Sequence, residues 1–253
     1  MLLTTMEYSW SNKIYIVYTG PHIITDGLEL AIDIGSIQSY PGTGTTVTDI
    51  ISETTFTPDV NAPAFNTTGI AYMDMEKNNP DNLKSTAGYS GMNTQNAYTR
   101  IGWFNIESSD NNFRPIIGNV IGNNINMGLT IVGSKLHFRQ YTNTYNGGTI
   151  SGDYGVSGNA SISTGAWTQG AMVVNRSAQT LNLYLNGALD KSTSITVIGN
   201  SSSSSVLIGG PDSDSYNGAR YFDGKIARVL HYNRELTALE IAQDYNALKN
   251  RFI

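Results

Sequence analysis

Residues 180–186 (TLNLYLN) alternate strictly between apolar and polar side chains and run directly into an Asn-Gly pair. Successive side chains of a strand point to opposite faces, so the three leucines are predicted to face a core, and Asn182, Tyr184 and Asn186 to face outward. Asn186-Gly187 favours a tight two-residue turn, because both central residues of that turn need positive φ. The segment predicts an antiparallel β-hairpin with one buried face.

Similar short runs, bounded by Gly, Pro, Asn and Ser, occur along most of the chain. Residues 45–96 are weakly patterned, and 78–93 and 141–160 are expected to be polar loops. In residues 221–232 the apolar side chains change from one face of the strand to the other between Ile226 and Val229. This change predicts a β-bulge near Ala227-Arg228. We expect further strands at Gly27–Ile34, Ala71–Met75, Thr99–Ile106, Pro115–Val120, Asn126–Val132, Lys135–Tyr141, Trp167–Asn175, Ser192–Val197, Val206–Ile208 and Tyr221–Tyr232.

Composition supports an all-β chain. Only 14% of the 253 residues are charged, against a typical ~25%, and 26 are glycine. Such a composition suits short strands joined by many turns, because Gly supplies positive φ and Ser, Thr and Asn bond locally to the backbone. We therefore predict one large all-β domain, since sandwiches and barrels routinely reach this length as one unit.

Several function classes are excluded by what the sequence lacks. The absence of cysteine removes disulfides, thiolate metal sites and Cys nucleophiles. The net charge is −5 and there is no Lys/Arg-rich run, so no nucleic-acid partner is expected. No apolar stretch approaches ~18 residues, so no membrane partner is expected either. Residues 1–10 lack the basic start and apolar segment of a signal peptide.

One helix is predicted over residues 237–250. Thr237 and Glu240 have the spacing of a capping box, in which each side chain bonds to the backbone N–H of the other residue. Leu236 and Ile241 flank this box as a hydrophobic staple. The apolar stripe of the helix is predicted to pack on the sandwich or to close one end of it; it consists of Ala238, Ile241, Ala242, Tyr245 and Leu248.

The chain divides into an N-terminal segment, 1–25, and a sandwich domain, 26–253, that includes the helix. Residues 14–18 are β-prone and end at Gly20-Pro21. The segment is either an extra edge strand or an arm that anchors a neighbouring subunit. Loose termini are common, which favours the plainer interpretation.

The C-terminal third resembles the concanavalin A-like lectin/glucanase superfamily, in its laminin G-like, pentraxin-related branch. In that branch a strand ending in Y-x-N-G is followed by I-G, then F-x-G-x-I, then Y-N-R-x-L and E-I. The matching positions are Tyr184, Asn186, Gly187, Ile208, Gly209, Phe222, Gly224, Ile226, Tyr232, Asn233, Arg234, Leu236, Glu240 and Ile241. The resemblance implies an all-β, concanavalin A-like fold: a two-sheet antiparallel sandwich of the jelly-roll kind with one C-terminal helix. It implies function only weakly, since this fold hosts lectins, enzymes and scaffolds.

Three further segments resemble structural proteins of tailed bacteriophages that carry the same sandwich. They are Gly20–Leu28, Tyr40–Thr45 and Tyr245–Phe252. The stretch after Thr46 departs from the pattern, because the expected D-x-S-G-x-x-N-N-G is replaced by Thr48–Glu53. The resemblance therefore covers about residues 20–253, with 45–96 as a specialised part.

No catalytic constellation is visible. Glycoside hydrolysis needs two carboxylates about 5 to 9 Å apart. The nearest pair is Asp74 and Glu76, in a segment that reads as the end of an ordinary strand, so we expect two solvent-facing charges. The histidines, His22, His137 and His231, do not form an H-x-x-x-H pair, and there is no G-x-S-x-G or P-loop. The chain is predicted not to be an enzyme.

Two loops carry the side chains expected of a glycan site, namely aromatic rings for apolar sugar faces and polar groups for hydroxyls. Tyr and Asn are also common in polar β loops, which is the plainer interpretation. Trp103 and Trp167 lie in predicted strands and are expected in the core. The glycan-binding candidates are Tyr141, Tyr145, Asp153, Tyr154, Tyr216, Arg220 and Tyr221.

A calcium ion is the one cofactor that the sequence leaves open. Asp212 and Asp214 offer hard oxygen ligands in a loop, but no Glu closes an EF-hand. A plain solvated turn explains the same residues.

The resemblance implies a non-catalytic structural protein of a bacteriophage virion, either capsid decoration or a tail or fibre component. Its expected location is the virion, and its partners are other virion proteins. A lectin or adhesin that binds glycan on the host surface is the alternative, and a glycan hydrolase ranks third. A homo-oligomer stays open.

Overall fold

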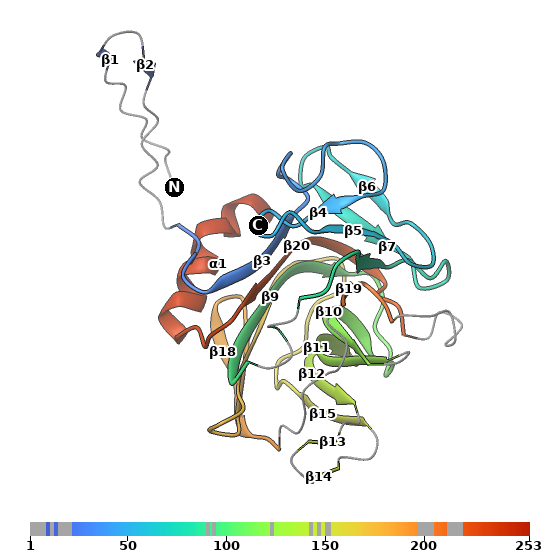
Figure 1. Cartoon of the computed structure of the whole chain (residues 1–253), viewed down its shortest axis with the longest axis vertical. Coiled ribbons are helices and arrows are strands. Elements are labelled where there is room, and N and C mark those ends of the chain that lie inside the picture. Colours follow the sequence, from blue (N-terminus) through green and yellow to red (C-terminus); the bar gives the residue numbers. More distant parts are fainter. Residues whose placement is uncertain are drawn as a thin grey trace.

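The computed structural model describes residues 22–89, 92, 95–121, 124–141, 144–145, 148–149, 153–196, 205–211 and 220–253, with two short strands before them. Two antiparallel sheets face each other and one helix lies outside them (Figure 1). This is the predicted two-sheet sandwich with a C-terminal helix. None of the helical residues described forms a helix long and apolar enough to cross a membrane.

The sheet nearer the helix is called the helix-side sheet. Its strand order is β18-β17-β16-β9-β20-β7-β6, and β3 also pairs with β20. The start of β20 pairs with β7 and its end with β3, so β20 lies at the centre of this part of the sheet. The bounds are β3 Leu28–Asp33, β6 Ala64–Asn66, β7 Tyr72–Met75, β9 Ala97–Ile106, β16 Trp167–Asn175, β17 Thr180–Leu185, β18 Ala188–Ser194 and β20 Gly224–Tyr232.

The other sheet is called the opposite sheet, and its order is β15-β12-β11-β10-β19-β8-β5-β4. Two further pairs, β1 with β2 and β13 with β14, form small sheets of their own. The bounds are β1 Ser9–Trp10, β2 Lys13–Ile14, β4 Val47–Thr48, β5 Thr55–Pro58, β8 Leu83–Ser85, β10 Arg114–Ile121, β11 Asn124–Val132, β12 Lys135–Tyr141, β13 Thr144–Tyr145, β14 Gly148–Thr149, β15 Asp153–Ser157 and β19 Val206–Ile208.

The main core lies between the two sheets. It includes Phe104 and Leu183 from the helix-side sheet and Leu129, Leu136 and Phe138 from the opposite sheet, all buried in one cluster. Burial of this apolar surface supplies the main stabilising free energy of such a sandwich. The predicted inward face of the hairpin is confirmed by this cluster, since Leu181 and Leu183 belong to it and Leu185 packs against it.

The predicted hairpin turn and β-bulge are both present. Asn186 and Gly187 have φ of 50° and 78°, as the turn between β17 and β18 requires. The register of β20 against β9 shifts between Ile226 and Arg228, which is the predicted bulge. The returning strand starts directly after the turn, at Ala188, and so earlier than the predicted Ser192.

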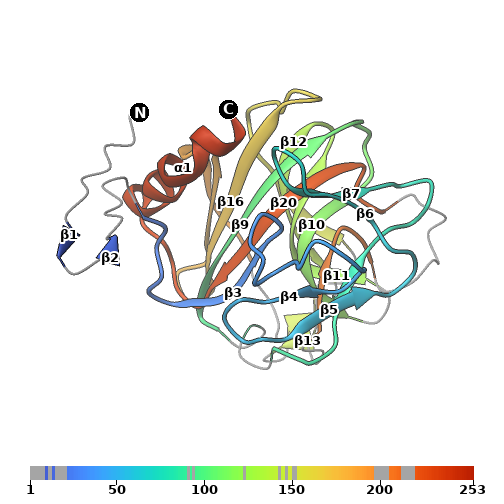
Figure 2. The same ribbon diagram turned by 90° about the horizontal axis from the view of Figure 1, so that it is seen from above.

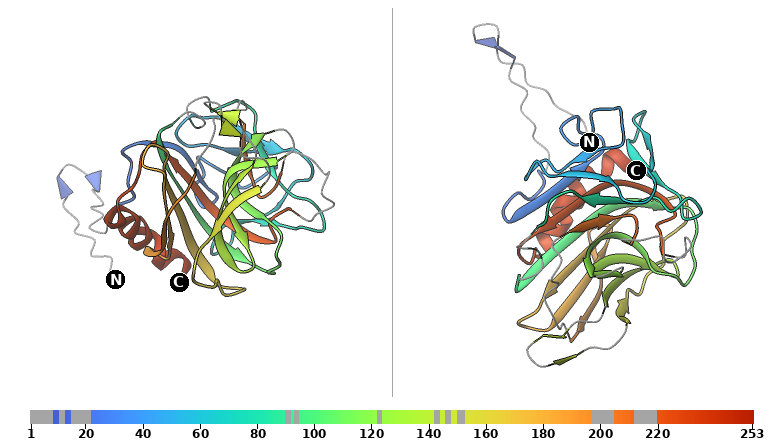
Figure 3. Two further views of the ribbon diagram at one scale, coloured as in Figure 1. Left: turned by 90° about the horizontal axis from the view of Figure 1, so that it is seen from below. Right: turned by 45° about the vertical axis from the view of Figure 1, so that its right-hand side comes forward.

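Helix α1 (Ala238–Phe252) lies across the outer face of the helix-side sheet (Figures 2 and 3). Thr237 and Glu240 form the predicted capping box. Beneath the helix, the Trp103 ring stacks on Phe252 and Tyr245, with centroids 4.2 and 5.6 Å away. Trp103 is therefore in a core, as predicted, but this core lies outside the sandwich.

The prediction that Tyr184 faces outward is wrong as far as solvent is concerned. Its side chain is 6% exposed and belongs to a second buried cluster with Ile241 of α1 and Ala31 of β3. The strand alternates as expected, but the helix covers the face that the alternation assigns to water.

The described residues between 45 and 96 form five short strands, of which only β7 matches a predicted one. Strand β8 lies within the predicted polar loop 78–93, and β13, β14 and β15 lie within the predicted loop 141–160, so those loop assignments are wrong in part. Such short strands are held by cross-strand pairing, for example Leu207 with Lys84, rather than by a local alternation of their own. Three residues give too short a pattern to predict.

Candidate functional site

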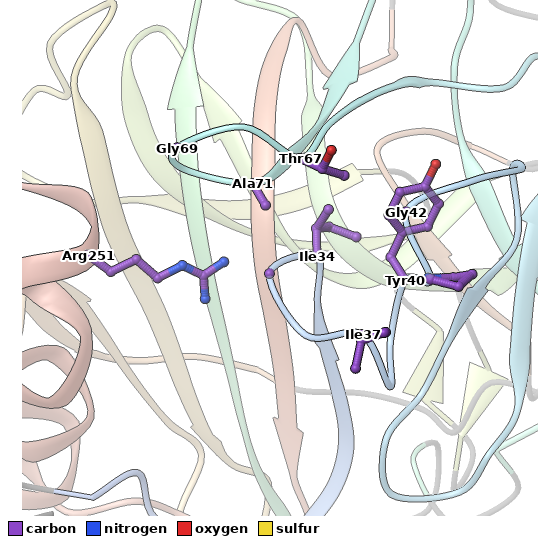
Figure 4. Close-up of a pocket in the computed structure, with 10 residues that line it drawn as sticks. Ile34, Ile37, Tyr40, Gly42, Thr67, Gly69, Ala71 and Arg251 are labelled. Atoms are coloured by element: carbon purple, nitrogen blue, oxygen red, sulfur yellow. The ribbon is translucent and has the colours of Figure 1, made fainter.

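A surface pocket of about 450 Å³ opens beside the C-terminal end of α1 (Figure 4). Three segments form it: the loop after β3, the turn between β6 and β7, and the last turn of the helix. It is lined by Ile34, Gly35, Ile37, Tyr40, Pro41, Gly42, Thr67, Gly69, Ala71 and Arg251.

The loop after β3 is fixed by local bonds and by one aromatic stack. The amide of Gly35 donates to Asp33 Oδ1 at 2.9 Å, and the amide of Tyr40 donates to the Ser36 carbonyl. The Tyr40 ring stacks on Phe65 at 4.2 Å, and its hydroxyl donates to a carbonyl in the same loop. These bonds hold one wall of the pocket in place and leave Ile37 81% exposed at its rim.

The turn between β6 and β7 forms the facing wall. Asn66 Nδ2 donates to the carbonyls of Thr68 and Ile70, and Asn66 Oδ1 accepts from the Thr68 amide, which closes the turn locally. Gly42 and Gly69 both have positive φ, and a Cβ at either would meet no atom within 4 Å. The pocket is therefore open at two glycines, one on each wall.

Arg251 reaches the pocket from the last turn of α1. Its Nη1 donates to both oxygens of Asp33 at 2.7 and 2.8 Å. Arg251 Nη2 is buried and has no hydrogen-bond partner within the described part of the chain. This group lies directly against Gly35, where a Cβ would collide with it. Glycine at position 35 is what lets the guanidinium reach this wall.

Further polar groups lie behind Asp33, under the helix. Arg228 Nε is 3.5 Å from Asp33 Oδ2, and Arg228 Nη1 is 3.7 Å from Asp244 Oδ1. Asp244 is fully buried and accepts from Gln169 Nε2 at 3.0 Å. Burial raises the pKa of Asp244, although Arg228 opposes the shift. The guanidinium groups of Arg228 and Arg251 thus share Asp33, and the carboxylate of Asp244 is inaccessible to solvent.

A second charged group lies at the start of β20. Carboxylate oxygens of Asp74, Glu76 and Glu107 lie within 4.8 Å of one another, and Lys225 pairs with Glu107. Burial first, and then Glu107, raise the pKa of Asp74. Hard oxygen ligands of this kind suit a divalent cation, but Lys225 already neutralises one of them. Glu76 is exposed, as predicted, but Asp74 is only partly exposed and its Oδ1 is buried, so the prediction of two solvent-facing charges holds for Glu76 alone.

Asp81 lies next to this group. It accepts the Glu76 amide at 3.0 Å, and burial raises its pKa to about 6. Its side chain is almost fully buried, so it supports the turn after β7 from inside.

The sequence-predicted glycan candidates are not brought together into one described surface. Tyr154 is half-buried against the main core, and Tyr221 is fully buried. Arg220 lies 5.9 Å from the Phe113 ring centroid. The side chains of Tyr141, Tyr145 and Asp153 lie outside the description, as do Tyr216, Asp212 and Asp214, so the calcium and loop-site predictions stay predictions.

Sequence reasoning missed the pocket. Its separate signals were visible: Tyr40-Pro41-Gly42 as a turn cluster and Arg251 within the C-terminal motif. Nothing in the sequence links these positions to Gly69, because the docking of α1 on the helix-side sheet sets their proximity.

Residues 78–242 match the sequence model of the Laminin_G_3 family, described as the concanavalin A-like lectin/glucanases superfamily. The match spans more than half of the chain and confirms the superfamily expected from the sequence. No curated protein sequence matches the chain.

Solved structures are similar in fold. One is the binding domain of botulinum neurotoxin DC in complex with SialylT, with TM-score 0.62 and 15% identity, over 88% of this chain and 52% of that one. Another is botulinum neurotoxin type C, whose cell entry depends on interaction with two ganglioside molecules, with TM-score 0.61 and 12% identity, over 88% and 51%. A third is Trypanosoma rangeli sialidase in complex with 2,3-difluoro-KDN, with TM-score 0.63 and 14% identity, over 90% and 34%.

At these identities the likeness shows the fold alone. The chain spans about half the length of the toxin structures and about a third of the sialidase.

Proposed function

This chain belongs to the concanavalin A-like lectin/glucanases superfamily, and on that premise we propose that it is a non-catalytic carbohydrate-binding domain. Two structural neighbours are toxin structures. One, a binding domain of botulinum neurotoxin DC, is in complex with SialylT, and the cell entry of the other, botulinum neurotoxin type C, depends on interaction with two ganglioside molecules. A shared fold alone does not assign a ligand. The proposal therefore depends on a site in this chain.

The pocket beside α1 is the observation that carries the proposal. It is concave, is walled by loops on a rigid sandwich, and has a volume in the range of small-ligand sites. Exposed Ile37 offers an apolar contact, while Thr67 and Arg251 offer polar ones. This combination suits a sugar ring, which has an apolar face and a polar edge.

Binding to an array of immobilised neutral and acidic glycans tests this function. Gly69→Asn fills the open rim with a side chain that tolerates positive φ, so we expect it to weaken binding by about tenfold or more. Gly165→Asn is the matched control, since Gly165 has φ of 79° and equally open surroundings away from the pocket. Absence of binding to every glycan at millimolar concentration would contradict the proposed function.

A second candidate function is that of a structural component of a bacteriophage virion, either capsid decoration or tail or fibre, located in the virion with other virion proteins as partners. The pairing of β1 with β2, and with no strand of the two large sheets, favours it. Of residues 1–21, the structure describes only these two strands. A strand pair of this kind would suit contact with a neighbouring virion protein.

Deletion of residues 1–21 tests the second candidate. Residues 22–25 are kept, because Tyr232 Oη donates to the Ile24 carbonyl and Gln243 Nε2 donates to that of His22. We expect the truncated domain to keep its melting temperature and to disappear from purified particles. A truncated protein that still assembles into particles would remove this candidate.

A further inference from the structure

We propose that the pocket beside α1 selects a sugar residue that carries a carboxylate. This inference rests on the proposed carbohydrate-binding function and names the ligand class for that site. The chemistry is shared by sialic acids and by uronic acids.

The charge of the pocket is the first argument. Arg251 is the only charged side chain among its ten lining residues. Its side chain is 27% exposed, so part of it faces the opening. A guanidinium donates hydrogen bonds and accepts none, and its planar fork matches a carboxylate. The pocket therefore presents a positive donor and no competing carboxylate on its lining.

The hydrogen bonding of Arg251 is the second argument. Asp33 occupies Nη1 alone, although the fork of Arg251 could engage a carboxylate through two nitrogens. Buried donors are nearly always paired, so a donor such as Nη2 without an acceptor, among the described residues, needs an explanation. An acceptor supplied by a ligand, after a small shift of the wall at Gly35, is the explanation that we propose.

The charge balance behind the pocket is the third argument. Asp33 faces two cations, Arg251 and Arg228, so its single negative charge cannot neutralise both. Asp244, the other carboxylate of the cluster, is fully buried and 3.7 Å from Arg228. With Asp244 the cluster holds two cations and two carboxylates and is balanced as a whole, but Arg251 is the member that lines the pocket, so a ligand carboxylate would meet the positive side of the cluster.

The walls restrict the shape of the ligand. Ile37, 81% exposed, provides an apolar surface for one ring face. Gly42 and Gly69 leave the rim open on both sides, so a substituent can extend out of the pocket. These features favour one charged ring bound edgewise over a flat aromatic ligand.

Titration calorimetry on the unmodified protein tests the proposal without any substitution. The probes are galacturonic acid, its methyl ester, N-acetylneuraminic acid and galactose. We expect at least one of the two acids to bind about tenfold or more tightly than the ester and galactose, with the preference weakened by salt. The two acids separate a uronic-acid ligand from a sialic-acid ligand.

Two variants locate the effect. Arg251→Gln is expected to abolish the preference for the acid, whereas Lys249→Gln, in the same helical turn but above the Tyr245 ring, should retain it. Binding in which neither acid exceeds the methyl ester and galactose, or an acid preference that survives Arg251→Gln in a folded variant, would overturn this inference and leave the proposed function intact. Binding of none of the probes or arrayed glycans would overturn both.

Discussion

Two charged clusters share strand β20 but lie in different surroundings. Arg228 belongs to the first, with Asp33, Arg251 and buried Asp244, and α1 covers it. Lys225 belongs to the second, whose carboxylates lie at the exposed end of the strand.

The helix explains the difference between the clusters. Under α1, cations are held at fixed positions and one of them reaches a cavity. At the open end, three carboxylates lie close to Lys225, and burial raises the pKa of Asp74 and of Glu76. The comparison teaches that a covering helix can hold charged side chains buried with donors left unpaired by the residues that the structure describes, Arg251 Nη2 among them, whereas the same kinds of side chain at an open strand end stay partly or fully exposed to solvent.

The largest expected effect comes from breaking the covered cluster. Asp244→Ala leaves Arg228 without its buried carboxylate and Gln169 Nε2 without its acceptor. We expect a loss of about 3 kcal/mol in the free energy of unfolding, measured by urea denaturation. Asn250→Ala, an exposed substitution in the same helix, should change it by less than about 0.5 kcal/mol. Equal changes in the free energy of unfolding for the two variants would show that the buried carboxylate of Asp244 does not stabilise the fold.

The dependence of stability on pH is expected to be an effect of intermediate size, smaller than that of Asp244→Ala. The pKa of Asp81 is raised to about 6, so this group favours folding when protonated, and its contribution is lost as pH rises from about 4 through 6. Arg234 lowers the pKa of Glu240 to about 2, so that contribution is present above pH 4.5 and is lost as pH falls towards 2.

NMR titration of the carboxyl carbons measures both groups directly. We expect Asp81 to titrate near pH 6, and Asp81→Asn to flatten the decline in melting temperature between pH 4 and 6. An Asp81 signal that titrates near pH 4 would contradict the burial that the structure assigns to it.

The smallest effect is expected at the open cluster. Asp74→Asn removes a carboxylate close to Glu107 and Glu76, so we expect the free energy of unfolding to be unchanged or to rise by up to about 0.5 kcal/mol after solvent screening.

An activity assay at the same cluster tests the proposal that the domain is non-catalytic. We expect the parent protein to release no reducing ends from polysaccharides, so that Asp74→Asn and Glu76→Gln have no activity to remove. Hydrolysis that the two substitutions abolish would make the open cluster an active site.

Local patterns in the sequence predicted the elements that depend on local physics. The hairpin at Asn186-Gly187 follows from turn geometry, and the start of α1 follows from the capping box of Thr237 and Glu240. The bulge before Arg228 follows from a slip in apolar phase. In each case the determining residues are close neighbours in the chain.

The rest depends on contacts between distant segments. Strands β5 and β8 are too short to show a period, and their pairing joins Phe56 to Ser85. Tyr184 is buried because α1 packs over it. The pocket unites Gly35, Gly69 and Arg251, which meet only after the helix has docked. No local pattern in the sequence predicts that these three residues line one pocket.

The most direct test of the central claim is chemical-shift mapping of the ¹⁵N-labelled protein with a bound glycan. We predict that the perturbed amides lie in residues 34–42, residues 67–71 and the last turn of α1, and that Gly69→Asn removes these shifts while Gly165→Asn does not. Shifts confined to residues 74–76 and 107, or to the loops around Tyr154 and Arg220, would contradict the assignment of the binding site to the pocket beside α1.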